Sequence, residues 1–175
     1  AFSGLSMNGN YSIAPKRDDD PTNGVSTVDL VLIQKHILGV DPLNSAYKVI
    51  SADADRSNDV SAIDLVELRK LILTVYDKLP NNTSWRFVPK AYNFNNIQNP
   101  WGFPEKLDIN GLSKDEIARD FVGIKVGDVN GNVVPHSLLG AEAREIGGTL
   151  KFRTLDQTLK AGEETTVEFT AENFT

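Results

Sequence analysis

Apolar residues recur with a helical period in two stretches of the chain, residues 25–38 and 60–73. Both stretches place apolar side chains at positions i, i+3 and i+7: Leu30, Ile33 and Ile37 in the first, and Leu65, Leu68 and Ile72 in the second. This spacing puts the side chains on one face of an α-helix. The sequence therefore predicts two amphipathic helices, each of which has to bury its apolar face against another element.

The two stretches are copies of one unit. Residues 25–38 align with residues 60–73 without a gap, and eight of the fourteen positions are identical. A repeat of this quality indicates an internal duplication, so we expect the two helices to pack against each other. Further apolar positions recur and are expected to widen the packing face: Val31, Leu38, Val66 and Leu73. Gly39 and Pro42 should end the first helix.

Short runs of alternating or β-branched residues predict strands outside the duplicated unit. These runs are residues 11–13, 85–88 and 121–129, and further along residues 149–154 and 165–170. Ser113 and Glu116 fit a capping box and predict a short helix that ends near Arg119. The connector at residues 44–52 is too short and too weakly periodic for a full helix, so we expect each unit to be a loop followed by one helix.

An acidic loop precedes each predicted helix and carries oxygen atoms at the spacing of a calcium-binding loop. A calcium ion takes about six to eight oxygen ligands, which a loop of the EF-hand type supplies from positions 1, 3, 5, 7, 9 and 12, the seventh through its carbonyl. These positions are Asp18, Asp20, Thr22, Gly24, Ser26 and Asp29 in the first loop, and Asp53, Asp55, Ser57, Asp59, Ser61 and Asp64 in the second. The ninth residue would bind through water. Asn23 and Asn58 hold the sixth position, where a positive φ is required and asparagine tolerates it.

A second interpretation of these loops needs no metal. Ser26 and Ser61 could serve as N-caps of the two helices, with the carboxylates left in solvent. The occurrence of two loops in one register favours calcium. Pro21 and Thr22 depart from the acidic pattern and make the first loop the weaker site.

A third stretch resembles the first half of a calcium loop. Asp128, Asn130 and Asn132 have the right spacing, but no Ser-x-x-Asp pattern and no predicted helix follow them. We therefore expect a β-turn there, and two calcium sites in the whole chain.

Composition narrows the possible functions. The 175 residues carry a formal net charge of −6, which argues against a nucleic-acid partner, because phosphate backbones are bound by basic surfaces. The absence of cysteine excludes disulfides and zinc–thiolate sites. No apolar run approaches the roughly 18–20 residues of a membrane span. No nucleophile motif or phosphate-binding glycine loop occurs, so we predict no catalytic residue and no enzyme activity.

The repeated pattern Val-Ser-x-x-Asp-Leu-Val-x-x-x-Lys-x-Ile-Leu resembles a type I dockerin, a calcium-dependent module that docks onto cohesin domains. This resemblance covers about residues 16–76. The chain is similar in particular to dockerin-like segments of large secreted multidomain surface proteins of the Bacteroidetes type. The stretches Asn81–Val88 and Phe121–Gly131 also recur there, which extends the resemblance to about residues 8–132.

The resemblance implies an α+β fold, in which a dockerin-like pair of calcium loop–helix units is flanked by short β-strands. A further β-sandwich domain, cohesin-like or immunoglobulin-like, would begin at the C-terminus. The expected organisation is the end of a preceding β-domain (1–15), the dockerin-like domain (16–79), an aromatic-rich β extension packing on it (80–132), a linker (133–148) and the start of the following β-domain (149–175).

The implied function is that of a calcium-stabilised structural or interaction module in a secreted or bacterial cell-surface protein, of the adhesin or surface-filament type. Its partners would be flanking β-domains of the same chain or of a neighbouring subunit. A second interpretation is calcium-dependent binding of a cohesin-like domain through exposed helix residues: Gln34, Lys35, Arg69 and Lys70. A third is a non-catalytic region of a secreted hydrolase. Cohesin-binding dockerins carry hydroxyl side chains just after the ninth loop position, where this chain has Thr27-Val28 and Ala62-Ile63. These pairs are more apolar, and we expect them to belong partly to the core, which favours the structural role.

Overall fold

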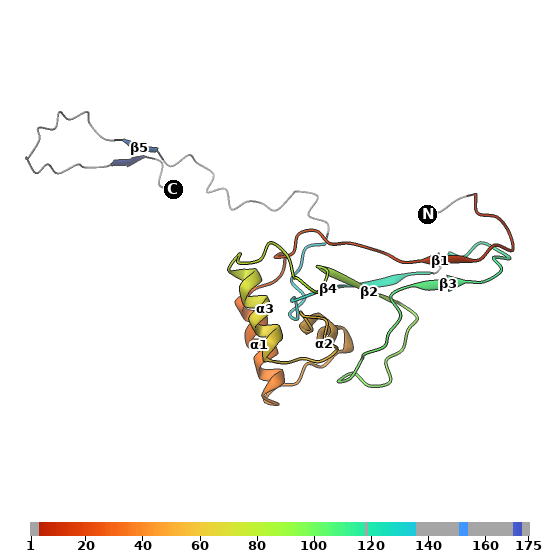
Figure 1. Cartoon of the computed structure of the whole chain (residues 1–175), viewed down its shortest axis with the longest axis horizontal. Helices are drawn as coiled ribbons and strands as arrows, with labels where there is room; N and C mark the ends of the chain where they lie inside the picture. Colours follow the sequence, from red (N-terminus) through yellow and green to blue (C-terminus); the bar gives the residue numbers. More distant parts are fainter. Residues whose placement is uncertain (1–3, 118, 136–150, 154–169, 173–175) are drawn as a thin grey trace, which may run out of the picture. The chain divides into compact units, whose positions relative to one another are not determined.

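The computed structural model describes residues 4–117, 119–135, 151–153 and 170–172. The chain forms two units, residues 1–135 and residues 136–175. The described part of the first unit contains the helices α1 (Thr27–Ile37), α2 (Ala46–Ala52) and α3 (Ala62–Ile72) and the strands β1 (Tyr11–Ile13), β2 (Trp85–Pro89), β3 (Leu107–Ile109) and β4 (Phe121–Lys125) (Figure 1). The expected α+β class is confirmed. In the second unit, β5 (Lys151–Arg153) and β6 (Thr170–Glu172) form an antiparallel pair; most of the predicted linker and of the two predicted strands lies outside the described residues.

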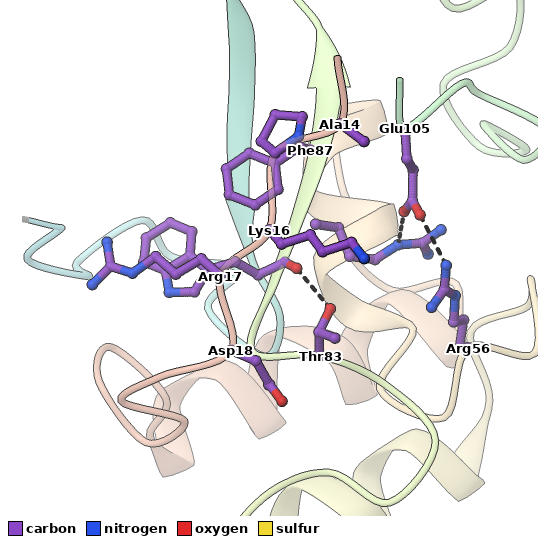
Figure 2. A pocket seen from close by; sticks show the side chains of 11 residues that line it. Ala14, Lys16, Arg17, Asp18, Arg56, Thr83, Phe87 and Glu105 are labelled. Atoms are coloured by element: carbon purple, nitrogen blue, oxygen red, sulfur yellow. Dashed lines mark hydrogen bonds and ion pairs between the residues drawn. The ribbon is translucent and has the colours of Figure 1, made fainter. Parts of the chain in front are cut away.

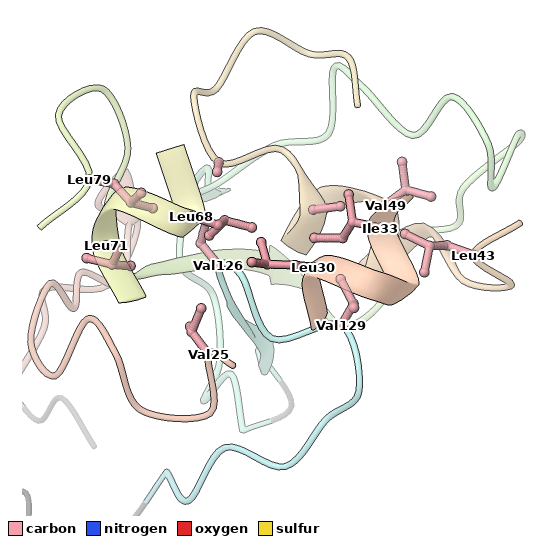
Figure 3. Close-up of a cluster of buried hydrophobic side chains, with 12 residues drawn as sticks. Val25, Leu30, Ile33, Leu43, Val49, Leu68, Leu71, Leu79, Val126 and Val129 are labelled. Carbon is pink, nitrogen blue, oxygen red and sulfur yellow. The ribbon is translucent and has the colours of Figure 1, made fainter. Parts of the chain in front are cut away.

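The two duplicated helices pack side by side, as predicted from their apolar period (Figure 1). Leu30, Ile33 and Leu68 are buried in one cluster, together with Leu71 of α3 and Val126 after β4 (Figure 3). Burying an aliphatic side chain of this kind stabilises the fold by about 1.5–3 kcal/mol. The α1–α3 pair therefore forms the main core of the unit.

The prediction that further apolar positions widen the packing face of the two helices is wrong. Val31, Leu38, Val66 and Leu73 are all exposed, with 45–66% of their surface accessible. On an α-helix, a residue next to a core position is rotated by about 100° from it, so Val31 and Val66 point away from the partner helix. Val28 and Ile63, expected to be partly core-like, are also more than half exposed.

Gly39 follows the C-cap of α1, where the sequence predicted the end of the helix, and its counterpart Thr74 follows the C-cap of α3. Gly39 has φ 66° and Thr74 has φ 55°. Their amide groups donate equivalent hydrogen bonds of 3.0 Å, to the carbonyls of His36 and Leu71. A left-handed residue is common after a helix, but it is glycine that adopts this conformation without a steric penalty.

Residues 46–52 form a helix where the sequence predicted only a connector. The seven-residue helix α2 buries Val49 in the main core and Ile50 in a second cluster with Val88, Phe103 and Ile124. Short helices have little stability of their own, so tertiary packing decides their formation. The weak apolar period of this segment reflects burial on more than one side.

The strands form two-stranded antiparallel pairs. β2 pairs with β4, with Trp85 opposite Lys125 and Pro89 opposite Phe121. β1 pairs with β3, so residues 11–13 join the aromatic-rich extension. That extension packs its aromatic rings mainly against α2 and the β2–β4 pair, around Phe103. The helix predicted from Ser113 is wrong: the described residues of this stretch are irregular, and Ile117, its main apolar residue, is 92% exposed.

The chain turns sharply after β4, at Gly127. This residue has φ 89°, and a Cβ atom added to it would lie 2.7 Å from Cδ2 of Leu68. Only glycine fits this close approach. The turn brings Asp128 and the residues after it to the start of α1.

Candidate metal centre

The second predicted loop gathers three carboxylates. Asp53, Asp55 and Asp64 each offer an oxygen atom, and these oxygen atoms all lie within 4.8 Å of one another. Asp53 directly follows α2, and Asp64 lies in the first turn of α3. Asp53 and Asp64 are fully buried, and Asp55 is half-buried. A largely buried group of three carboxylates requires charge compensation, and a divalent cation with oxygen ligands is one chemical solution.

Backbone amides hold the first half of this loop around the carboxylates. Asp53 accepts hydrogen bonds from the amides of Ser57 (Oδ1, 2.9 Å) and Asn58 (Oδ2, 3.1 Å). Asp55 Oδ1 also accepts from the amide of Ser57, at 3.0 Å. The tight path requires positive φ at Arg56 (61°) and at Asn58 (63°), so the conformation expected for Asn58 is confirmed.

Asp64 ties the loop to the start of α3. Its Oδ1 accepts from the amides of Ala54 (2.8 Å) and Asp55 (3.2 Å), and its Oδ2 accepts from the amide of Ser61 (2.8 Å). Ser61 is the N-cap, and its hydroxyl accepts from the amide of Ile63 at 3.2 Å. The N-cap expected in the metal-free interpretation therefore exists, but Asp53 and Asp64 are buried and not left in solvent as that interpretation expected.

The electrostatics of the cluster oppose the charged state of its aspartates. Burial raises the pKa of Asp53 to about 6, with a smaller contribution from the charge of Asp64. Burial also raises the pKa of Asp64, and the neighbouring charge of Asp55 adds to this effect. Nη1 of Arg86 lies 3.8 Å from Oδ2 of Asp53 and gives partial compensation. A cation bound here would relieve the remaining repulsion.

Two further predicted ligands of this loop lie at its exposed rim. Ser57 and Asp59 are exposed, and the Ser57 hydroxyl lies 3.5 Å from the carbonyl oxygen of Asp59. This contact places a side-chain oxygen and a carbonyl oxygen close to each other, as the fifth and seventh loop positions require.

The first predicted loop is built differently. Asp18 Oδ1 accepts hydrogen bonds from the amide (2.8 Å) and the hydroxyl (3.2 Å) of Ser84. Asp20 Oδ2 accepts from the Asn23 side chain at 2.9 Å. The positive φ predicted for Asn23 is wrong: Asp20 and Gly24 adopt positive φ in this loop, and Asn23 does not. Within the described ranges, Asp53, Asp55 and Asp64 are the one group of three or more His, Cys, Asp or Glu side chains placed so that they could hold a metal ion, so Asp18, Asp20 and Asp29 do not come together in this way.

Asp29 instead meets the loop after β4. It is fully buried, and its Oδ1 accepts hydrogen bonds from the amides of Val129 (3.0 Å) and Asn130 (3.1 Å). Its Oδ2 accepts from the amide (2.9 Å) and the hydroxyl (2.8 Å) of Ser26, the N-cap of α1. Asp29 thus makes the contacts that Asp64 makes, but to a segment about one hundred residues further along the chain.

Residues 128–132 reproduce the hydrogen bonds of residues 53–57. Asp128 accepts from the amides of Asn132 (Oδ1, 3.2 Å) and Val133 (Oδ2, 2.9 Å), four and five residues ahead, as Asp53 does. Asn130 Oδ1 accepts from the amide of Asn132 at 3.0 Å, as Asp55 does from Ser57. The fourth position has positive φ in both segments, at Arg56 and at Gly131. The first half of a loop of this type therefore lies at residues 128–132 and its second half at residues 24–29.

A buried lysine accompanies this second arrangement. Burial lowers the pKa of Lys125 to about 8, while the charges of Asp20 and Asp128 oppose that change. Its Nζ donates to the carbonyl of Pro21 at 2.7 Å. Lys125 therefore supplies local positive charge near Asp128, as Arg86 does near Asp53.

The Asp-x-Asn-x-Asn spacing of residues 128–132 is a signal in the sequence, but the relation of this segment to Asp29 is not. The second half of the loop lies about one hundred residues upstream, so no contiguous pattern joins the two halves.

The residues expected to contact a partner lie on the helix surface. Gln34, Lys35 and Arg69 are exposed, whereas Lys70 is half-buried. Nζ of Lys70 contacts Glu67 Oε1 and the Tyr76 hydroxyl, both at 3.0 Å.

Comparison with protein-family models, with curated proteins and with solved structures found no match. Within the described residues, the helices are too short to cross a membrane.

Proposed function

We propose that this chain is a calcium-stabilised structural and interaction module of a secreted or cell-surface multidomain protein, of the dockerin-like type suggested by its repeat. The observation that carries the proposal is the cluster of Asp53, Asp55 and Asp64, two of them fully buried, at the start of a duplicated helix. An unfolded chain does not assemble these ligands, so the free energy of ion binding contributes directly to folding.

In the first proposed site, the second loop holds the ion. Asp53, Asp55, Ser57 and Asp64 provide side-chain oxygens, Asp59 provides its carbonyl, and Ser61 binds through water. Three carboxylates against a divalent ion leave a local charge of about −1, which suits a permanently occupied structural site.

The second proposed site is split between two parts of the chain. Asp128, Asn130 and Asn132 take the places that Asp53, Asp55 and Ser57 hold in the first site. Gly24, Ser26 and Asp29 keep the places that the sequence assigned to them. Asp18 and Asp20 then have structural roles, as the contact of Asp18 with Ser84 supports. With two carboxylates, this site should bind calcium more weakly than the first.

A split site would have a mechanical consequence. The ion would join the residues that follow β4 to the residues that begin α1. Cross-linking segments so far apart in sequence restricts the unfolded chain more than closing a twelve-residue loop does. Calcium would in this way hold the extension and the helix pair in one rigid body, between whatever domains flank them.

Calorimetric titration with calcium tests both the metal and the split. We expect the chelator-treated wild type to bind two ions per chain, and Asp128→Asn to bind one. Asp20→Asn is the matched control: it removes the same charge from the contiguous first loop and should still bind two. If Asp20→Asn bound one ion and Asp128→Asn bound two, the split site would be refuted. If the wild type bound no calcium, the proposal of a metal site would be refuted.

A second candidate function is the docking of a cohesin-like β-domain on the exposed helix surface. The observation that favours it is a duplicated set of exposed apolar side chains: Val28 and Ile63, Val31 and Val66, Leu38 and Leu73, and Val40 and Val75. Each pair is separated by the repeat length, and Lys35 lies on the same helix as Val28 and Val31. Exposed apolar residues that cluster mark interaction surfaces. Calcium-dependent capture of a cohesin domain, lost in Val31→Asp but kept in Lys114→Asp, would support it; no capture by the wild type would count against it.

A further inference from the structure

A cavity of about 460 Å³ lies beside β2, between this strand and residues 14–18 (Figure 2). Its polar walls are Lys16, Arg17, Asp18, Arg56, Arg86 and Glu105, with Thr83 at one side. Four cations and two carboxylates give these walls a surplus of two positive charges. This local excess of positive charge contrasts with the net charge of −6 of the chain. The residues of these walls are not among the proposed calcium ligands.

Two of the charged groups are already occupied elsewhere. Arg17 Nε pairs with Asp19 Oδ1 at 2.6 Å, its Nη1 donates to the Pro135 carbonyl at 2.9 Å, and its guanidinium stacks on the Trp85 ring at 4.7 Å. Asp18 accepts from Ser84. The groups left to meet a ligand are therefore Lys16, Arg56, Arg86 and Glu105.

Glu105 cannot neutralise the three cations around it. Its Oε1 accepts from Arg86 Nε at 2.7 Å, and its Oε2 accepts from Arg56 Nη2 at 2.8 Å. Lys16 makes no ion pair with any other residue that the structure describes, and its side chain extends toward the same point as those of Glu105 and Arg56 (Figure 2). Asp53 Oδ2 lies 3.8 Å from Arg86 Nη1 and offsets part of the Arg86 charge, so Lys16 is the cation of the three without a carboxylate partner among the described residues.

Arg86 is fixed in place by its ion pairs with Glu105 (2.7 Å) and Asp53 (3.8 Å). Only 7% of the residue is exposed, its guanidinium lies 4.6 Å from the Phe103 ring centroid, and its buried Nη1 has no hydrogen-bond partner among the described residues. A guanidinium held rigidly in this way keeps its charge and loses little entropy when an anion approaches.

We propose that this cavity binds the carboxylate of a small acidic ligand. Lys16 and Arg56 would contact the carboxylate at the cavity mouth, and Arg86, which its two carboxylate contacts hold in place, would form the inner wall. Pro15 and Phe87 line the same cavity and offer an apolar surface to the rest of the ligand. The volume suits a single acidic sugar or amino acid, within the roughly 300–1,000 Å³ range of ligand pockets.

Nuclear magnetic resonance offers a direct test, because the chain has two tryptophans and Trp85 lines the cavity. The calcium-saturated protein is titrated with sodium glucuronate, with sodium N-acetyl-aspartate and with glucose, at constant ionic strength. We expect at least one of the two carboxylates to shift the Trp85 indole signal. The shift should saturate at a ligand concentration below about 50 mM, as expected for a weak site with a dissociation constant of roughly 1 mM. Glucose should leave the signal unchanged.

Two variants of equal charge separate the cavity from a general electrostatic effect. Lys16→Met should weaken binding by about three- to tenfold, whereas Lys90→Met, whose side chain pairs with Asp120 at 3.8 Å, should bind as the wild type does. Response to glucuronate alone would identify an acidic sugar, and response to N-acetyl-aspartate alone would identify an acidic peptide group; either supports the site. The proposed site would be overturned if neither probe gave a saturable shift, or if Lys16→Met bound the probes as tightly as the wild type does.

Discussion

Oδ1 of Asp29 accepts a hydrogen bond from the amide of Val129 at 3.0 Å, and this contact joins the first turn of α1 to the end of the β2–β4 region. Asp64 makes the equivalent contact to Ala54, at 2.8 Å, within its own loop. The duplicated helices thus use the same aspartate in the same way, but on segments with different positions in the chain. The pseudo-repeat of the structure extends beyond the repeat of the sequence.

Asp128 should matter for stability even without a metal. Its carboxylate accepts hydrogen bonds from three backbone amides, those of Gly131 (2.7 Å), Asn132 (3.2 Å) and Val133 (2.9 Å). Asp128→Ala leaves these amides without their partner, and we expect a loss of about 1–3 kcal/mol in the free energy of unfolding. Urea denaturation in chelator measures the loss. Asp120→Ala, at an exposed ion pair of 3.8 Å, should change stability by less than about 0.5 kcal/mol; equal losses in the two variants would contradict the role of Asp128.

In the metal-free protein, the titration of Asp53 should add stability as the pH falls from 7 to 5. The pKa of Asp53 is about 6 in the folded state and about 3.9 in an unfolded chain. Between these values the folded state binds the proton more tightly, so acidification favours folding until both states are protonated, below about pH 4. Melting curves in EDTA measure this trend. Asp53→Asn removes the titrating group, so the trend should be smaller in the variant; an equal trend in both proteins would contradict the assignment.

Thr74→Gly should stabilise the protein. Thr74 is β-branched, is exposed and has φ 55°, a conformation that costs a non-glycine residue about 1–2 kcal/mol. Part of the gain is lost to the greater flexibility of glycine in the unfolded chain, so we expect a net gain of about 1 kcal/mol by urea denaturation. Gly39→Thr, the reciprocal change at the end of α1, should destabilise by a similar amount. A loss of stability in Thr74→Gly would contradict the conformation of this residue.

Gly127→Ala should destabilise the fold more than Gly102→Ala does. Both glycines have φ above 80°, but an added Cβ at Gly127 would lie 2.7 Å from Leu68 Cδ2, whereas at Gly102 it would meet no atom within 4 Å. The backbone term of about 1 kcal/mol applies to both, and overpacking adds about 1–3 kcal/mol at Gly127. Thermal and urea unfolding of the two variants give the difference, and equal stability would show that the turn moves away from α3.

The elements with a strong local signal were predictable from sequence. The i, i+3, i+7 positions of the duplicated unit identified both helices and the buried Leu30 and Leu68. The period of α2 was hidden because Val49 and Ile50 are buried in different clusters. The helix predicted at Ser113 failed because a capping pattern has little effect without an apolar face to bury.

The candidate site divides in the same way. Asp53, Asp55 and Asp64 lie close in sequence, so their spacing predicted the cluster that the structure contains. The partner segment of Asp29 was not predictable by the same means, because the hydrogen bonds to Val129 and Asn130 depend on the β2–β4 pairing and on the turn at Gly127. Long-range contacts of this kind have no local pattern in the sequence.

The most direct test of the calcium proposal is the melting temperature of the wild type in excess calcium and in EDTA, measured beside Asp64→Asn at pH 7. Asp64 accepts hydrogen bonds from both halves of the loop and is fully buried, so this variant should lose most of the response while its helix N-cap, Ser61, remains. We expect calcium to raise the wild-type melting temperature by at least about 5 °C, which corresponds to roughly 1–2 kcal/mol for a domain of this size. An unchanged wild-type melting temperature, or an equal rise in the variant, would contradict calcium binding at Asp53, Asp55 and Asp64.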